Sequence, residues 1–246
     1  MNTNIKNKII NLARNSEEEI CGFLYYNDYG LFDIFPCENV AFNKTEEFEI
    51  DPKDFLNCEK IGKICGVYHS HPGDENSFSE SDIEFIEELG VPLYMFCAGD
   101  NSWHEYIPPT YKIELEKLPF IWGLFDCYSI IRNYLRQEKN IFLPDFDRTE
   151  KFETMEVNEP DIISNIKGAG GVIICEQPNI DFTKLKIGDV LLFTTKIKEK
   201  NNPLHFGIFL GNSTFLHHPQ NRISQKSYLN LGWLNRLSHV IRHNTL

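Results

Sequence analysis

The chain has 246 residues, enough for one large domain or two compact ones at about 150 residues per domain. Its 41% hydrophobic and 24% charged residues exclude a disordered protein. With 24 basic and 36 acidic residues the formal net charge is −12, so the chain lacks the positive surface that nucleic acid or an anionic membrane would require. We therefore expect no nucleic-acid partner and no membrane insertion.

The cysteines and the first residues indicate a cellular compartment. Seven cysteines are widely spaced and form no C-x-x-C pair, which predicts neither a disulfide framework nor a cysteine-based zinc cluster. Residues 1–19 lack the apolar run of a signal peptide, and nowhere do about 18 apolar residues follow one another. These features predict a cytoplasmic protein with reduced thiols, unless another machine exports it.

The first hundred residues mix predicted helices and strands. Apolar residues at helical spacing predict a helix over residues 5–14, and an apolar run predicts a strand over 21–26. Residues 66–72 alternate and predict a strand ending at a proline, followed by a polar loop to Phe78. A further strand is expected over residues 91–99. This mixture predicts an α+β domain.

A helix is expected between the last two of these strands. Ser81 and Glu84 have the spacing of a capping box, which predicts the start of the helix. Gly90 marks its end. Three apolar residues are expected to face inward: Ile83, Ile86 and Leu89.

The hydrophobic pattern restarts after Pro108-Pro109, which places a domain boundary near residues 108–118. A helix with an apolar face is expected from Asp126 onward. Residues 145–185 show no pattern that assigns them to helix or strand. After Gly188-Asp189, three runs predict consecutive antiparallel strands: VLLFTT, HFGIFLG and TFLHH.

The first half contains residues suited to a mononuclear zinc site. His69 and His71 lie two apart on a predicted strand, so both imidazoles project from one face. Asp82, in the first turn of the next helix, could join them and leave the fourth zinc position open, as in catalytic sites. Ser79 could hydrogen-bond a ligand or a developing oxyanion, and Glu19 is the best candidate for the proton acceptor. The alternative for two alternating histidines alone is an ordinary packed or surface strand.

Four of these residues follow the pattern His-x-His-x7-Ser-x2-Asp without a gap: His69, His71, Ser79 and Asp82. With Glu19 two residues before Cys21-Gly22, the pattern resembles that of the JAMM metallopeptidases. The resemblance implies that the two histidines and the aspartate hold zinc, that Glu19 is the general base and that the serine assists. It also implies a JAMM (MPN, cytidine-deaminase-like) α/β/α sandwich that hydrolyses a peptide or isopeptide amide.

The second half contains a candidate nucleophile. Cys127 is expected to begin a helix, whose N-terminus would stabilise a thiolate and lower the thiol pKa, although inert cysteines are also common there. His205 and His217 lie on two consecutive predicted strands. A three-residue loop at 211–213 would put both histidines on one face, with His217 opposite Gly207, whereas a two-residue loop would separate them. The chemistry requires His217 to orient His205, which removes the thiol proton.

Asp126-Cys127 and the run from His205 to Asn212, with a second histidine at 217, resemble the NlpC-type papain-like cell-wall peptidases. The resemblance implies Cys127 as nucleophile, His205 as base and His217 as the orienting residue, with His218 pointing away. Tyr128 stands where those enzymes usually have a small residue, which leaves the substrate preference open.

A JAMM-type domain followed by an NlpC-type domain resembles the tail tip assembly protein K family of long-tailed phages. The resemblance implies two α+β domains, a zinc metallopeptidase over residues 1–110 and a cysteine peptidase over residues 111–246. It implies a role in completing the tail tip in the host cytoplasm, with the virion tail tip as an alternative final location. The implied partners are phage tail tip proteins and a peptide or peptidoglycan-peptide substrate.

Two other interpretations stay open at the level of sequence. In the first, the chain is a catalytically silent assembly factor or structural tail component that keeps the motifs only as a scaffold. In the second, it is a bacterial murein peptidase or toxin unrelated to virions. The absence of a signal-peptide pattern disfavours a secreted enzyme, although a virion or secretion device could deliver one.

Overall fold

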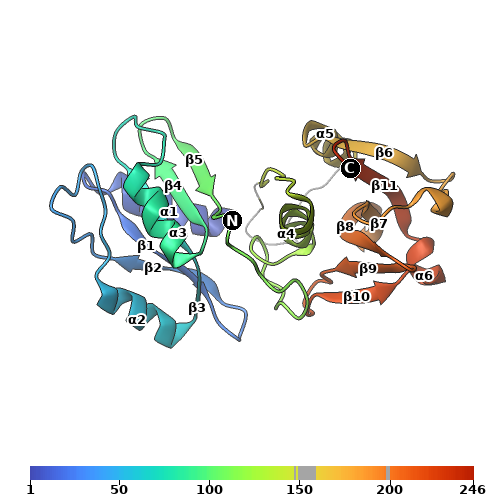
Figure 1. Cartoon of the computed structure of the whole chain (residues 1–246), viewed down its shortest axis with the longest axis horizontal. Coiled ribbons are helices and arrows are strands. Elements are labelled where there is room, and N and C mark those ends of the chain that lie inside the picture. The colour runs from blue at the N-terminus through green and yellow to red at the C-terminus, as the bar shows by residue number, and fades with distance from the viewer. Residues whose placement is uncertain (147, 149–158, 198–199) are drawn as a thin grey trace. The chain divides into compact units, whose positions relative to one another are not determined.

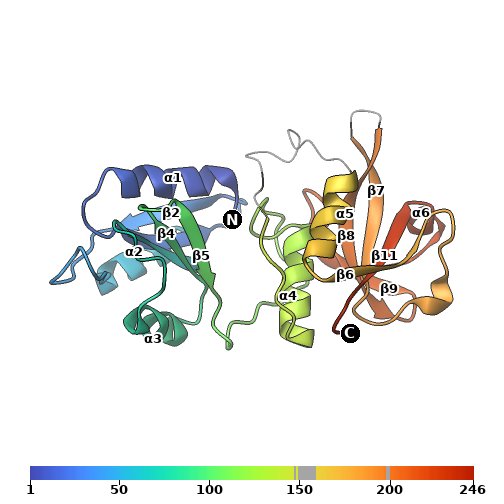
Figure 2. The same ribbon diagram turned by 90° about the horizontal axis from the view of Figure 1, so that it is seen from above.

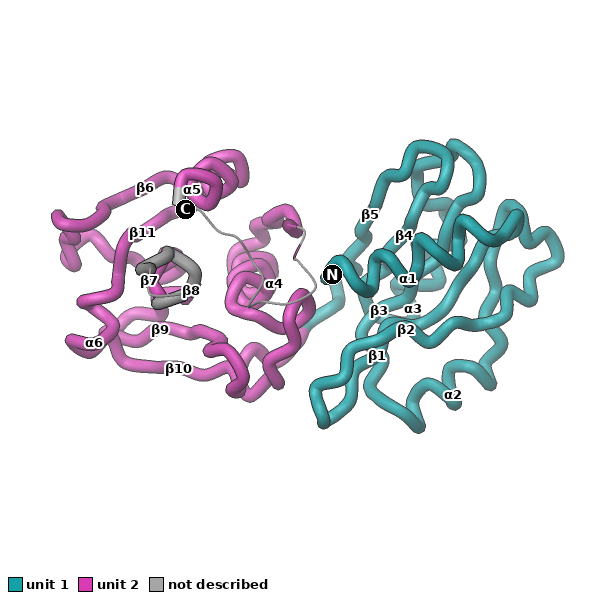
Figure 3. The backbone as a smooth tube through the Cα atoms, turned by 180° about the vertical axis from the view of Figure 1, so that it is seen from behind, with its two compact units in different colours: residues 1–112 teal, residues 113–246 magenta. Residues whose placement is uncertain are grey.

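The structure is a computed structural model that describes the following residues: 1–146, 148, 159–197 and 200–246. It divides into two compact units, residues 1–112 and 113–246, each built around its own sheet (Figures 1 and 3). Within the described part of the chain, no helix is long and apolar enough to cross a bilayer.

The first unit is an α/β/α sandwich around a five-stranded sheet of order β2-β1-β3-β4-β5. Its strands are β1 Cys21–Tyr26, β2 Phe32–Cys37, β3 Lys63–His71, β4 Leu93–Cys97 and β5 Ser102–Tyr106. Its helices are α1 Thr3–Arg14, α2 Pro52–Ile61 and α3 Glu80–Leu89. Figure 2 shows α1 on one face of the sheet and α2 and α3 on the other. The helix and strands predicted from periodicity in this region are confirmed.

The apolar pattern of the sequence explains this arrangement. Helix α1 buries a stripe of residues four apart along its length: Ile5, Ile9 and Ala13. The opposite side of the sheet contributes Phe23 and Val67 to a core that Cys58 of α2 and Ile86 of α3 complete. Strands β3 and β4 are parallel because α3 crosses between them, while the other neighbouring strands are antiparallel. The histidine-bearing strand β3 is therefore central in the sheet.

Helix α3 begins two residues earlier than predicted. Its capping box is Ser79 with Asp82, not Ser81 with Glu84. Ser79 has an extended backbone and accepts from the Asp82 N–H, and the Asp82 carboxylate accepts from the Ser79 N–H. Both serines satisfy the capping pattern in sequence, so the spacing alone could not choose between them.

The second unit contains a six-stranded antiparallel sheet of order β10-β9-β8-β7-β11-β6. Its strands are β6 Gly171–Glu176, β7 Val190–Ile197, β8 Lys200–Gly211, β9 Thr214–His217, β10 Gln225–Tyr228 and β11 Leu237–His243. Its helices are α4 Cys127–Lys139, α5 Glu159–Gly168 and α6 Leu231–Leu234, with a 3-10 turn η2 at Phe182–Lys184. The three predicted strands are confirmed as β7, β8 and β9.

Helix α4 packs its apolar face on this sheet. Ile130, Ile131 and Leu135 form a core with Leu192 and Ile208 of the central strands. A second cluster contains Leu191, Phe193 and Phe215, because side chains along a strand alternate between faces. The stretch 145–185, which the sequence left unassigned, contains α5 and β6, and residues 147 and 149–158 within it lie outside the described residues. Helix α4 contacts strands β8 and β9.

Candidate functional sites

The end of β3 brings two histidines side by side in the interior of the first unit. His69 and His71 are both buried, and their Nε2 atoms are 3.2 Å apart. The His71 Nδ1 lies 2.8 Å from the carbonyl oxygen of Glu75. Because a carbonyl only accepts, Nδ1 carries the proton and Nε2 presents its lone pair to the cluster.

Two carboxylates from other elements complete this cluster. Glu19 lies just before β1, where Cys21 pairs with His69, and its Oε1 is 3.5 Å from the Nε2 of His71. The Oδ2 of Asp82 is 3.7 Å from the Nε2 of His69. One donor atom from each of Glu19, His69 and His71 lies within 4.8 Å of the others. This buried group could hold a metal ion.

The chemistry of the donors fits a divalent cation. Burial, reinforced by His71, lowers the pKa of His69 well below its usual value, so its imidazole is neutral and able to ligate a metal. Burial, followed by the charges of Asp82 and Glu75, raises the pKa of Glu19 to about 8. Carboxylates crowded together away from water create a demand for positive charge, which a metal ion would satisfy.

Ser79 acts on this cluster mainly through its backbone. Its N–H donates to the Asp82 Oδ2 at 2.8 Å, the same oxygen that faces His69. Its hydroxyl oxygen accepts from the Asp82 N–H and lies 3.0 Å from the Ser81 hydroxyl. The serine therefore orients the carboxylate by capping α3, a geometric basis for the helping role expected of it.

Asn39 is a residue of this site that sequence reasoning missed. Its buried side chain accepts from the N–H groups of Ala41 and Glu49 and donates to the carbonyl oxygens of Glu19 and Glu47, each at 3.0 to 3.1 Å. The backbone of Glu19 is thus tied to the loop after β2. A lone asparagine in a polar loop has no distinguishing pattern, so only the fold reveals this contact.

The second candidate site lies at the start of α4. Asp126 is the N-cap, and the buried Cys127 is the first helical residue. A backbone hydrogen bond from Phe206, the residue after His205, reaches the thiol, so Cys127 lies against β8. Burial, followed by the charge of Asp126, raises the pKa of Cys127 to about 12. The expectation of a lowered thiol pKa is wrong, because loss of water outweighs the favourable helix N-terminus.

The two predicted histidines of this unit form a hydrogen-bonded chain. The Nε2 of His205 is 2.8 Å from the Nδ1 of His217, and the Nε2 of His217 is 2.9 Å from the Oγ of Ser227. Burial lowers the pKa of His205 to about 3 and that of His217 to about 4, so both imidazoles are neutral near pH 7. The His205 ring stacks on Trp233 at 5.6 Å. Ser227 and Trp233 are further members of the site that the sequence did not indicate.

The strand register places these histidines together by a route different from the one predicted. The loop between β8 and β9 has two residues at 212–213, both with positive φ, and not three. A register shift at 209–211 supplies the extra residue that the loop lacks. His217 therefore faces Gly207, as expected, on the side of His205. His218 instead contacts the Arg222 carbonyl oxygen and the Phe120 ring, as expected for the opposite side of the strand.

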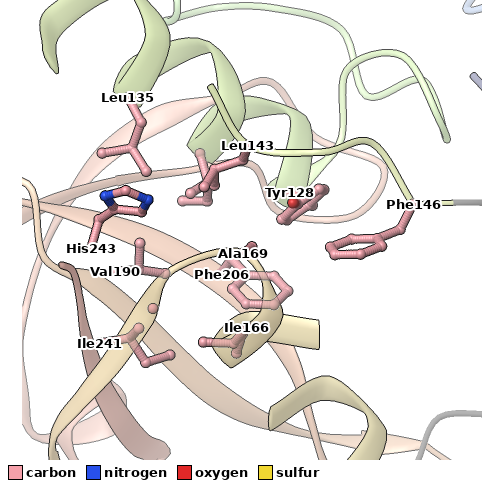
Figure 4. Close-up of a pocket in the computed structure, with 12 residues that line it drawn as sticks. Tyr128, Leu135, Leu143, Phe146, Ile166, Ala169, Val190, Phe206, Ile241 and His243 are labelled. Atoms are coloured by element: carbon pink, nitrogen blue, oxygen red, sulfur yellow. The ribbon is translucent and has the colours of Figure 1, made fainter. Parts of the chain in front are cut away.

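The neighbours of Cys127 and His205 in the chain line an apolar pocket. Figure 4 shows Tyr128 of α4 and Phe206 of β8 facing this space together with Phe146 and Ile166. The pocket is partly open to solvent, and its volume is about 430 Å³ when that open space is included. The hydroxyl of Tyr128 donates to the Pro144 carbonyl oxygen at 2.8 Å. The large residue after the cysteine is thus part of the helix–sheet interface.

Comparison with known proteins identifies both units. The sequence profile of the NlpC/P60 family matches residues 117–242, and that of prokaryotic homologs of the JAB domain matches residues 4–106. The chain is thus an α+β protein of two domains drawn from peptidase families, and it belongs to the NlpC/P60 family. The predicted fold class is confirmed.

The chain is a homologue of tail tip assembly protein K. It is 27% identical over 210 residues to that protein of Escherichia phage N15, covering 85% of this chain and 82% of the relative. It is 26% identical over 196 residues to that of Escherichia phage lambda, covering 79% and 89%. An NlpC/P60 family protein from Bacillus cereus aligns in structure with 13% identity, 95% and 66% coverage and a TM-score of 0.34. The recognition of both families and of protein K is confirmed.

Proposed function

We propose that the chain is a phage tail tip assembly protein with two peptide-bond hydrolase sites, one in each unit. The observation that carries the proposal is that side chains from distant segments of the chain meet in each unit. Glu19, His69, His71 and Asp82 come from three segments of the chain and meet in one buried cluster. In the other unit, His205 and His217 form a hydrogen-bonded pair on the strands next to Cys127. Packing alone does not require such polar groups to be buried together.

In the first unit, His69, His71 and Asp82 would hold Zn²⁺, and Glu19 would be the general base. When bound, the ion supplies Lewis acidity that polarises a peptide carbonyl and makes water more acidic. Glu19, whose carboxylate a bound cation would keep ionised despite its raised pKa, takes the proton of the attacking water and passes it to the leaving amine. Ser79 keeps Asp82 in place through the cap of α3. The substrate is a peptide or isopeptide amide.

In the second unit, Cys127 would be the nucleophile and His205 the base. The hydrogen-bonded chain is satisfied when His205 donates from Nε2 to His217 and His217 donates from Nε2 to Ser227. This leaves Nδ1 of His205 to accept the thiol proton. The sulfur attacks the carbonyl carbon, the amine leaves with the proton from His205, and water releases the acyl group from Cys127. Since the resting thiol pKa is high, proton transfer accompanies the attack.

The partners and location follow from the relatives. Two proteins named for tail tip assembly align with most of this chain. Tail tip proteins are therefore the expected partners, and either a tail protein or a peptidoglycan peptide is the expected substrate. The expected place of action is the host cytoplasm during tail assembly, with the virion tail tip as the alternative final location.

A cleavage assay with the full chain tests this proposal. Purified wild type, Glu19→Gln, Cys127→Ala and the double variant are incubated with zinc and either peptidoglycan peptides or isolated tail tip proteins. We expect each single variant to lose a different cleavage and the double variant to lose both. Undiminished cleavage in the double variant would contradict both site assignments.

A second candidate is a tail assembly factor without peptidase activity. The burial of Cys127 and its high pKa favour this alternative for the second unit. Wild-type protein that cleaves none of these substrates yet supports tail tip assembly would establish it.

A further inference from the structure

The segment that carries Cys127 is organised around a buried carboxylate. Asp126 is completely buried, and its oxygens accept from the N–H groups of Ser129 at 2.8 Å and Gly123 at 3.0 Å and from the Ser129 hydroxyl at 2.9 Å. These contacts cap α4 and fix the turn before it. They also place a negative charge next to the sulfur that must become negative during catalysis. A buried anion beside a thiol disfavours the thiolate.

Arg148 supplies the opposite charge at this point. Its Nε lies 2.7 Å from the Asp126 Oδ2, and its Nη1 lies 2.6 Å from the Asp145 Oδ1. The guanidinium is buried and also approaches the ring of Tyr128, the residue after the nucleophile, at 5.4 Å. Arg132 lies 3.7 Å from Asp145, so the two carboxylates are matched by two guanidiniums. Arginine stays charged throughout the working pH range.

We infer that Arg148 is a positioning residue of the proposed cysteine peptidase site, which neutralises Asp126 so that the neighbouring sulfur of Cys127 can carry negative charge. The inference rests on the proposed function of the second unit. The sequence gives no sign of this role, because Arg148 lies 21 positions after Cys127 and no pattern joins them.

The electrostatic effects on each group agree with this role. Burial raises the pKa of Asp126, but Arg148 and the N–H donors of Ser129 and Gly123 outweigh it, so the carboxylate is ionised. At Cys127, burial and Asp126 raise the thiol pKa while Arg148 lowers it. Without the guanidinium, the thiol would face the carboxylate with no compensating charge.

The test measures the reactivity of the thiol directly and needs no substrate. Full-length protein is treated with iodoacetamide between pH 7 and 10, and the rate at Cys127 is followed by peptide mapping. We expect Arg148→Met to slow this alkylation about tenfold or more at a given pH and to move its pH profile upward. Arg148→Lys keeps the charge and should recover much of the rate.

A double variant separates charge from structure. In Asp126→Asn/Arg148→Met the carboxylate and its counter-charge are both gone, while the asparagine can still accept from Ser129 as an N-cap. We expect the double variant to alkylate faster than Arg148→Met alone. Arg242→Met is the matched control, because Arg242 pairs with the buried Asp189 elsewhere in the same unit at 2.7 and 2.9 Å. It should leave the pH profile of Cys127 unchanged.

Equal rates in wild type and Arg148→Met, including no reaction in either, would overturn the inference. A double variant as slow as Arg148→Met would also overturn it, since the arginine would then act only by holding the segment in place. If this alkylation pattern is found but the wild type cleaves no peptide, the role of Arg148 stands and the proposed function of the second unit fails.

Discussion

The two candidate sites differ in how they balance charge. In the first unit, Glu19 and Asp82 approach His71 and His69, and burial keeps the His69 imidazole neutral. Among the residues that the structure describes, no lysine or arginine pairs with these two acidic groups. In the second unit, Asp126 beside the thiol is matched by Arg148 from the same chain. The difference teaches that the first site could take a cation from outside, whereas the second carries its own positive charge in Arg148.

The contrast between the two sites fails most severely if the first site binds no metal ion. We expect purified wild type to hold about one zinc ion per chain and His69→Ala or Asp82→Ala to hold none, because each removes a ligand from a site with only three. Metal analysis of the purified proteins measures this. Glu19→Gln is the control and should keep the metal. If Glu19→Gln also loses it while Asp82→Ala does not, the two carboxylates have exchanged roles.

His205 and His217 test how the second site holds its proposed base. We expect His217→Ala to lower kcat for the Cys127-dependent cleavage by about 10² to 10⁴-fold, since His205 loses the acceptor that fixes its tautomer. His217→Asn should retain more activity, because its amide oxygen can accept the same bond. Steady-state kinetics across pH measure both variants. Equal activity in wild type and His217→Ala would remove His217 from the mechanism.

Most helices and strands and most candidate site residues could be predicted from the sequence, because the periodicity of apolar residues and the spacing of motif residues depend on nearby positions in the chain. The alternation of β3 placed His69 and His71 on one face, and the restart of helical periodicity located α4 and its first residue, Cys127. The roles of Asn39 and Arg148 could not be predicted, because each depends on contacts between segments far apart in the chain. Their residue types carry no signal without the fold.

Two predictions are wrong because the sequence shows local features but not how the folded chain surrounds them. The loop between β8 and β9 is shorter than predicted, and a bulge at residues 209–211 restores the register. Sequence spacing reports the total number of residues between His205 and His217 but not how the strands absorb them. The predicted lowering of the Cys127 pKa is wrong because a helix N-terminus is visible in sequence, whereas the extent of burial is not.

Asn39 tests whether the first site depends on its supporting loop. Asn39→Ala leaves the Ala41 and Glu49 N–H groups and the Glu19 carbonyl oxygen without their partner, so we expect a loss of about 2–4 kcal/mol in the free energy of unfolding. Chemical denaturation measures this loss. Asn43→Ala, at an exposed position of the same loop, is the control and should change stability by less than about 0.5 kcal/mol. Equal effects would mean that Asn39 does not hold the loop.

His218 gives the second unit a stability that depends on pH. Burial lowers its pKa in the folded protein to about 4, below the ordinary value of 6.5, so the unfolded chain takes up the proton first as the pH falls. Its contribution to stability is present above pH 6.5 and is lost between pH 6.5 and 4, by up to about 1.4 kcal/mol per pH unit. The free energies of unfolding of wild type and His218→Gln, plotted against pH, should differ in slope between pH 6.5 and 4. Parallel curves would show that His218 is not buried as a neutral group.

Chelation tests the central contrast most directly. Cys127→Ala retains only the proposed zinc site and Glu19→Gln only the thiol site, so each variant reports one centre. We predict that a metal chelator abolishes the cleavage by Cys127→Ala, that added Zn²⁺ restores it, and that the cleavage by Glu19→Gln is unchanged throughout. Cleavage by Cys127→Ala that survives complete removal of metal, or cleavage by Glu19→Gln that requires metal, would contradict the account.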